Sequence, residues 1–189
     1  MFIKDWHPNK IIRLLSLHNF LTPVSRKLKY INIFYKGLFL VLGKEFIFQT
    51  LKQEFIEDNV FEIIKIGRDV PGEYWKKQHF LIDLPEKWKL SFVVIDDGGK
   101  PVAYAISSMK TAHQVHLHHF AVDSNCRGKG LGGFMIREVI SRAEQSFATV
   151  LTLKVSSKNR RGQSFYENHG FVMREYDKDY IVYEKTLKI

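Results

Sequence analysis

The stretch that decides the fold is residues 120–133, Phe-Ala-Val-Asp-Ser-Asn-Cys-Arg-Gly-Lys-Gly-Leu-Gly-Gly. It begins with the last residues of a predicted strand over 114–122 and leads into a predicted amphipathic helix over 130–147. Glycines let the backbone turn tightly, and the N–H groups at a helix start favour an anion. Arg127 and Lys129 add positive charge, which close packing of a strand against a helix would not require. The stretch therefore predicts a phosphate-binding turn.

Two other kinds of phosphate-binding turn fit this stretch less well. The P-loop of nucleoside-triphosphate enzymes needs Gly, four residues and then Gly-Lys-Ser or Gly-Lys-Thr, whereas Gly130 follows Gly128-Lys129 here. The dinucleotide fingerprint matches literally as Gly128-x-Gly130-x-x-Gly133, but it needs an acidic residue about 20 positions later. Residues 151–158 contain no acid, and an antiparallel hairpin is predicted before the turn. The residue pattern therefore excludes the P-loop, and the surrounding sequence argues against the dinucleotide fingerprint.

The turn resembles the coenzyme A pyrophosphate loop of the GNAT acetyltransferase superfamily. The resemblance rests on Arg127-x-x-Gly130-x-Gly132 after a strand that ends in Phe120-Ala121-Val122. A downstream segment resembles the second signature of that family, with Gly162 where a small Ala is usual: Asn159-x-x-x-x-x-Phe165-Tyr166-x-x-x-Gly170-Phe171. The resemblance covers residues 61–187.

The order of predicted elements from residue 61 onward is β-α-β-β-β-α-β-α-β-β. We expect strands over 61–66, 90–96, 102–108, 114–122, 149–155, 171–176 and 180–186, and helices over 71–81, 130–147 and 159–168. The resemblance implies an α/β (α+β) fold class. Its expected form is a GNAT-like mixed, mostly antiparallel sheet of six to seven strands, flanked by helices, with splayed parallel central strands.

The chain divides into two predicted parts. Residues 59–189 form the GNAT-like acetyltransferase domain, and residues 1–58 form a basic amino-terminal extension, partly helical, that is packed on the domain or appended to it. Within the extension, periodicity predicts helices over 9–20 and 45–57, while 28–43 fits a strand or a helix equally well.

Charge is distributed unevenly between these parts. Residues 1–53 hold nine of the 29 Lys and Arg residues but only two of the 20 acidic residues. Such a segment could attract a nucleic acid, an anionic membrane or an acidic protein, or could be a solvated cap. The single cysteine, Cys126, excludes an internal disulfide, and the longest apolar run, 37–43, is too short to span a bilayer. We expect a cytoplasmic protein with no transmembrane segment.

The resemblance implies that the strand end, the turn and the second motif bind acetyl-CoA. The implied cofactor-binding residues are Phe120, Ala121, Val122, Arg127, Gly128, Lys129, Gly130, Leu131, Gly132, Gly133, Asn159 and Tyr166. Asn159 would contact the pantetheine amide, with a helix cap as the alternative role. No metal site is expected, because the histidines lack partnering cysteines or closely spaced acids.

Acetyl transfer to an amine needs a polarised carbonyl, a neutral amine and a proton for the departing thiolate. By the resemblance, backbone N–H groups of residues 120–122 polarise the carbonyl, and Tyr166 gives its proton to the coenzyme A sulfur. A phenol has a pKa of about 10, so it is protonated at working pH. The alternative role for Tyr166 is a packed aromatic side chain between helix and sheet.

Histidines of one predicted strand are the candidates for the general base. An amine with a pKa of about 10 arrives charged, and histidine is the natural base near neutral pH. Strand alternation predicts that His116, His118 and Phe120 share one face and that His119 lies on the other. We rank His116 first and His118 second. The alternative is that the proton leaves through water and that these histidines are structural.

The predicted function is an N-acetyltransferase that moves an acetyl group from acetyl-CoA to a primary amine of a small molecule or a protein, by direct attack in a ternary complex. One alternative acceptor is a nucleic-acid-linked amine such as aminoacyl-tRNA, bound through residues 1–53. A non-catalytic acyl-CoA-binding regulator is the other alternative. A homodimer is possible, and the residues over 67–89 and 177–179 are expected to contact the acceptor.

Overall fold

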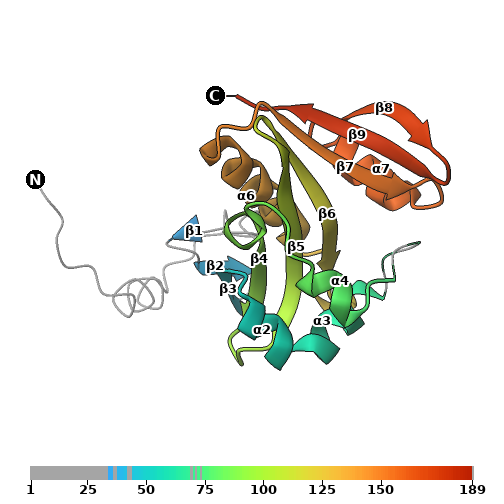
Figure 1. Cartoon of the computed structure of the whole chain (residues 1–189). Helices are drawn as coiled ribbons and strands as arrows, with labels where there is room; N and C mark the ends of the chain where they lie inside the picture. The colour runs from blue at the N-terminus through green and yellow to red at the C-terminus, as the bar shows by residue number, and fades with distance from the viewer. Residues whose placement is uncertain are drawn as a thin grey trace, which may run out of the picture. The chain divides into compact units, whose positions relative to one another are not determined.

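The computed structural model of the chain describes residues 34–35, 38–41, 44–68, 70, 72 and 74–188. The helix predicted over 9–20 and most of the segment 28–43 lie outside the described residues. The described elements form a layered arrangement in which helices cover both faces of one sheet (Figure 1).

One mixed sheet holds all nine strands of the described residues, in the order β1-β2-β3-β4-β5-β6-β7-β9-β8. All neighbours are antiparallel except β6 and β7, which are parallel. The strands are β1 (Phe34–Tyr35), β2 (Leu38–Val41), β3 (Lys44–Thr50), β4 (Phe92–Asp96), β5 (Pro101–Thr111), β6 (Gln114–Val122), β7 (Val150–Ser156), β8 (Val172–Asp177) and β9 (Tyr180–Thr186). The six strands β4 to β9 correspond to predicted ones, and residues 34–50 add three more.

Two hydrophobic cores lie on opposite faces of this sheet. One core contains apolar residues of α6 (Leu131–Gln145) and α5 (Lys87–Leu90), and the aromatic residues of α7 (Arg160–Glu167) pack against it. The other contains residues of α2 (Gln53–Asp58), α3 (Val60–Gly67) and α4 (Lys77–Leu81). Figure 1 shows α7 with β7, β8 and β9 at one end of the sheet and α2 to α4 toward the other.

Two predicted elements near the start of the domain are wrong. Residues 61–66 form most of helix α3 and not a strand, because Ile63 and Ile66, three positions apart, are the side chains that become buried. Residues 45–57 are not one helix, because Phe46 and Phe48 alternate inward as a strand does. Strand β3 pairs with β4 along Phe46–Thr50, and α2 follows it. Where the domain begins within the chain stays a prediction.

The parallel central strands diverge, as the resemblance predicts. Strand β6 pairs with β7 over residues 114–117 and 150–153 and no further. The remaining residues, 118–122 of β6 and 154–156 of β7, have no strand partner in each other. The predicted fold class is therefore confirmed, including the splay.

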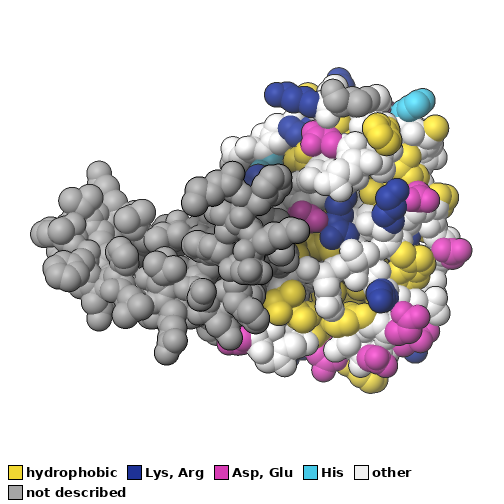
Figure 2. Space-filling view, turned by 90° about the vertical axis from the view of Figure 1, so that its left-hand side faces the viewer, with side chains coloured by type: hydrophobic (Ala, Val, Ile, Leu, Met, Phe, Trp, Pro, Cys, Tyr) yellow, Lys and Arg dark blue, Asp and Glu magenta, His cyan; other side chains and the backbone are white. Residues whose placement is uncertain are grey.

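No helix in the described part of the chain is long and apolar enough to cross a membrane. On the face displayed in Figure 2, Lys, Arg, Asp and Glu side chains of the described residues are interspersed with hydrophobic ones. This mixture agrees with the near balance of charge beyond residue 53.

Candidate active site

A cavity of about 610 Å³ opens between the diverging ends of β6 and β7. Its wall is made by residues 117–122 and 153–155 of these strands, by the glycine turn and by the first two turns of α7. This volume lies within the range of about 300–1,000 Å³ that small-molecule sites occupy. The two sequence motifs, 26 residues or more apart in the chain, therefore meet around one space.

The glycine turn needs glycine at two positions for backbone reasons. Gly128 has φ 74° and Gly130, at the N-cap of α6, has φ 84°, yet a Cβ at either position would meet nothing within 4 Å. The requirement is thus conformational and not one of space. Because the first N–H groups of a helix have no intrahelical acceptor, α6 offers several of them beside the cavity, where Gly132 and Gly133 lie.

The cations of the turn are tied to its own backbone. The Nε of Arg127 donates to the carbonyl oxygen of Val122 at 2.8 Å, and the Nζ of Lys129 donates to that of Asn125 at 2.6 Å. Arg127 lines the cavity, whereas Lys129 does not. Leu131 also lies outside the lining, because its side chain is buried in the core beneath α6. The other ten predicted cofactor-binding residues line the cavity.

Asn159 lines the cavity and also begins helix α7. Its Oδ1 accepts a hydrogen bond from the Gly162 N–H at 2.9 Å. A Cβ at Gly162 would lie 2.7 Å from the Asn159 Nδ2, which explains the glycine where the related signature has Ala. The cap uses the oxygen of this amide and leaves its N–H₂ donors for another contact.

Tyr166 lies on α7 within a cluster of aromatic rings and lines the cavity. Its ring centroid is 5.2 Å from that of Phe165, 5.5 Å from Phe171 and 6.3 Å from Phe120. These near edge-to-face contacts hold the ring at the wall between helix and sheet. This position is compatible with both roles predicted for Tyr166, that of a packed aromatic residue and that of a proton donor.

A β-bulge changes which histidines face the cavity. Ile106 pairs with His119 but Ser107 pairs with Leu117, so His118 is the extra residue of β6. Leu117 belongs to the core beneath α6, and Phe120 packs against that same core. His116 pairs with Ser108, two residues from Ile106, which belongs to the core beneath α3. The predicted alternation is therefore wrong, because the bulge puts His116 and Phe120 on opposite faces.

The histidines are held by hydroxyl groups of the neighbouring strands. The Nδ1 of His116 lies 2.8 Å from Thr152 Oγ1, and the Nε2 of His118 lies 2.7 Å from Ser108 Oγ. The two rings meet edge to face with centroids 4.8 Å apart. His118 lines the cavity and His116 does not. His119 is almost fully buried, stacked on Tyr104 and beside Trp75.

Burial and neighbouring cations keep His116 and His118 neutral near pH 7. Burial lowers the pKa of His116 to about 3, with His118, Lys110 and Lys154 acting in the same direction. The pKa of His118 is lowered first by burial and then by Lys110 and Lys87. A neutral imidazole can accept a proton, but a lowered pKa makes it a weaker base.

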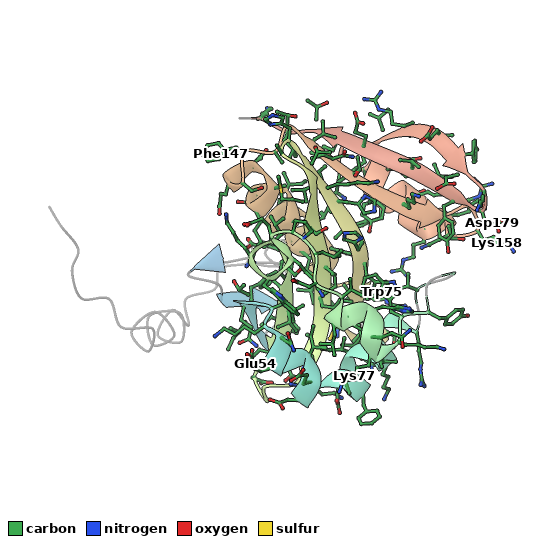
Figure 3. All side chains as sticks on the ribbon, viewed as in Figure 1. Glu54, Trp75, Lys77, Phe147, Lys158 and Asp179 are labelled. Carbon is green, nitrogen blue, oxygen red and sulfur yellow. The ribbon has the colours of Figure 1, made fainter. Side chains whose placement is uncertain are left out.

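The residues expected on the acceptor side are spread over several environments. Trp75 packs against His119 and Phe80 in the core, Tyr74 is exposed, and Asp177 pairs with Lys154 at 2.5 Å. Figure 3 places Trp75 beside α4 and Asp179 at the far tip of the β7–β9 region. Trp75, Tyr74, Asp177 and Asp179 do not line the cavity, whereas Val70 of the expected segment 67–89 does. Lys154, which the sequence did not suggest, lines it as well.

The structure also brings in residues without a sequence signal. The Tyr180 hydroxyl of β9 donates to the carbonyl oxygen of Gly72 at 2.8 Å. A side chain at Gly72 would lie 3.2 Å from Ser156 Cβ, so this connection passes close to the end of β7. The sequence analysis also missed Ser108 and Thr152, because the role of a polar residue inside an apolar strand becomes visible only once the strand register is known.

The described residues contain no group of three or more His, Cys, Asp or Glu side chains able to hold a metal ion.

Residues 51–171 match the model of the acetyltransferase (GNAT) family, which is more than half of the chain. The chain belongs to this family. The expected enzyme class, an acyltransferase, is thus confirmed at the level of the family. An uncharacterized N-acetyltransferase of Methanocaldococcus jannaschii is 24% identical over 150 residues. That match covers 74% of this chain and 66% of the relative's length, just under two thirds.

Solved structures with low identity share the GNAT fold. Ard1 from Thermoplasma volcanium has a TM-score of 0.66 at 20% identity, covering 76% of this chain and 99% of that one. The ribosomal-protein-S18-alanine N-acetyltransferase from Escherichia coli has a TM-score of 0.64 at 20% identity, covering 76% and 95%. The PaiA N-acetyltransferase from Thermoplasma acidophilum, in complex with coenzyme A, has a TM-score of 0.61 at 16% identity, covering 75% and 98%.

Proposed function

We propose that this GNAT protein is an N-acetyltransferase that moves an acetyl group from acetyl-CoA to a primary amine in a ternary complex. The observation that carries the proposal is the single cavity in which the glycine turn and Tyr166 meet. A turn with two left-handed glycines at a helix start suits a pyrophosphate, and a splay between strands suits an extended thioester arm. A similar fold holds coenzyme A in the PaiA structure, which supports the same donor here.

Each wall of the cavity supplies one requirement of the reaction. The N–H groups of the turn and of α6 would hold the phosphates, and the Asn159 amide N–H₂ would bind a pantetheine carbonyl. Backbone N–H groups along residues 120–122 would polarise the thioester carbonyl. As the amine nitrogen bonds to the carbonyl carbon and the C–S bond breaks, Tyr166 would give its proton to the sulfur. The positively charged nitrogen of the product would then lose its second proton, which restores the Tyr166 phenol.

His118 is the histidine we propose as general base. It lines the cavity, whereas His116, which ranks first on sequence grounds, lies behind it. The ammonium of the acceptor would give one proton to His118 and then attack as a neutral amine. A base with a lowered pKa is best matched to acceptors whose amine is only weakly basic, because the ammonium of such an amine gives up its proton more easily.

Replacing Tyr166 tests the proposal. In Tyr166→Phe, kcat for acetyl transfer should fall about a hundredfold, because the thiolate loses its acid, while the Kd for coenzyme A stays within about twofold. Turnover is measured by thiol release and by mass spectrometry of the product over a panel of primary amines. Tyr176→Phe is the matched control, since Tyr176 is 68% exposed and lies outside the cavity. A wild-type chain that acetylates no amine would contradict the proposed function, and a full rate in Tyr166→Phe would remove Tyr166 from the acid role.

A further inference from the structure

Two adjacent serines of β5 occupy opposite faces of the sheet. Ser107 is 1% exposed and Ser108 is 3% exposed, so both hydroxyls are removed from bulk water. Ser107 pairs with Leu117, on the face of the core beneath α6, and Ser108 pairs with His116 on the other face. In the described part of the chain the Ser107 Oγ has no hydrogen-bond partner, whereas the Ser108 Oγ lies 2.7 Å from the Nε2 of His118. Of the two serines, only Ser108 therefore has a side-chain hydrogen bond with a residue that lines the cavity.

The bulge is what makes the contact between Ser108 and His118 possible. In a regular ladder His118 would pair with Ser107, and Ser108 would pair with Leu117. Because His118 is instead the extra residue of the bulge, Ser108 pairs with His116 and the His118 side chain contacts Ser108. Ser108 is the one hydrogen-bond partner of the His118 side chain among the described residues. With Nε2 engaged, Nδ1 is the nitrogen left for a ligand in the cavity that His118 lines.

Proton positions then follow from the chemistry of imidazole. Neutral histidine carries one proton, so Nδ1 can accept a proton only if Nε2 already bears one. In that tautomer Nε2–H donates to the Ser108 oxygen. After Nδ1 takes the proton of the acceptor ammonium, both nitrogens are donors, and the bond to Ser108 becomes charge-assisted and stronger. The opposite tautomer, with the Ser108 hydroxyl donating to Nε2, would leave His118 without an acceptor toward the cavity.

We propose that Ser108 is a positioning residue that fixes the Nε2–H tautomer of His118 and stabilises its protonated form during acetyl transfer. This inference rests on the proposed function, because it assumes that His118 accepts the proton. The charged groups that act on His118, Lys87 of α5 and Lys110 of β5, both oppose its protonation. The neighbouring His116, which faces Lys110 and Lys154, is itself kept neutral. Ser108 acts against the two lysines, since its oxygen interacts favourably with an imidazolium and less strongly with a neutral ring.

Ser108→Ala tests the inference through the pH dependence of the wild-type reaction. Loss of a hydrogen bond to a charged group should lower kcat about tenfold. The acidic limb of the kcat profile should also move to lower pH by about one unit, because an unsupported His118 is a weaker base. Ser108→Thr keeps a hydroxyl and should restore both the rate and the limb. Imidazole nitrogen NMR on the wild-type chain should show the His118 proton on Nε2.

Ser107→Ala is the matched control, because it removes the neighbouring buried hydroxyl from the other face; its rate and pH profile should equal those of the wild type. A Ser108→Ala enzyme that is slower with an unmoved limb would reduce Ser108 to a structural role and overturn the inference, as would a His118 proton on Nδ1. His118→Gln separates the two proposals. If it keeps the full rate and pH profile, His118 is not the base; if it is slow while Ser108→Ala is normal, only the role of Ser108 is lost.

Discussion

Gly130 and Gly132, two positions apart in the turn, meet different physical requirements. Gly130 has φ 84° with open space where a side chain would be, so it is needed for its backbone. Gly132 lies within α6 and lines the cavity, and a Cβ there would lie 3.5 Å from the Phe165 ring, an ordinary contact. We therefore propose that Gly132 is needed for the room that it would leave to a ligand.

These requirements predict opposite effects of the same substitution. Gly130→Ala should lower the free energy of unfolding by about 1–2 kcal/mol, because alanine is strained in the left-handed region. Gly132→Ala should leave stability unchanged or raise it by less than about 1 kcal/mol, since alanine favours a helix. It should nevertheless weaken coenzyme A binding about tenfold, because the methyl group overfills the wall. Thermal unfolding and calorimetric titration with coenzyme A measure both; a Gly132→Ala variant with unchanged affinity would place the cofactor elsewhere.

The N-cap of helix α7, Asn159, has a structural role and a proposed binding role. The Asn159 side chain caps the helix through Oδ1, and its Nδ2 is the part of the same amide that can reach a ligand. The 8-residue helix in turn carries Phe165 and Tyr166 to the cavity wall. The cap thus sets the start of the element on which the proposed acid depends.

Two substitutions at Asn159 separate these roles. Asn159→Ala should lower the free energy of unfolding by about 1 kcal/mol, because the Gly162 N–H loses its acceptor. Asn159→Asp should preserve stability, since a carboxylate caps a helix equally well. If Nδ2 binds the pantetheine arm, both variants should lose coenzyme A affinity, which fluorescence or calorimetric titration detects. Unchanged affinity in Asn159→Asp would leave the cap as the whole role of this residue.

At the scale of the molecule, the connection between α4 and β4 contains a buried lysine, Lys87, that forms hydrogen bonds with backbone carbonyl groups. Lys87, the first residue of α5, is fully buried. Its Nζ donates to the carbonyl oxygens of Phe80 at 2.5 Å and Ile82 at 2.6 Å and lies 4.4 Å from the Trp88 ring centre. Burial lowers the pKa of Lys87 to about 8, an effect that Asp83 partly opposes. The fold therefore holds a lysine whose charge is costly.

This lysine predicts a rise of stability with pH. Between about pH 8 and pH 10.5 the unfolded chain binds the Lys87 proton more tightly than the folded chain, so the free energy of unfolding increases with pH in that window. Over this range the free energy of unfolding of the wild type should rise, relative to that of Lys87→Met, by no more than about 3 kcal/mol. Denaturant unfolding at several pH values measures the difference. Lys89→Met, at an exposed lysine paired with Glu86, should show no such trend; a flat difference for Lys87→Met would disprove the linkage.

Local sequence determined the turn, the second motif and six of the strands, because each depends on neighbours within a few residues. Glycines that require a left-handed backbone, alternating apolar residues and a helix cap are all written locally. The segment 61–66 was misread as a strand, since a short apolar run fits either element until its buried face is known.

Tertiary structure alone decided which side chains meet at the site. The register between β5 and β6 creates the bulge at His118, and that one extra residue moves His118 to the cavity and puts His116 and Phe120 on opposite faces. It also joins His118 to Ser108, ten positions away in the chain. Register follows from the packing of both faces and the pairing of whole strands, so no local pattern of residues specifies it. The glycine turn thus identified the donor of the reaction, and the pairing of the strands determined the groups that would face the acceptor.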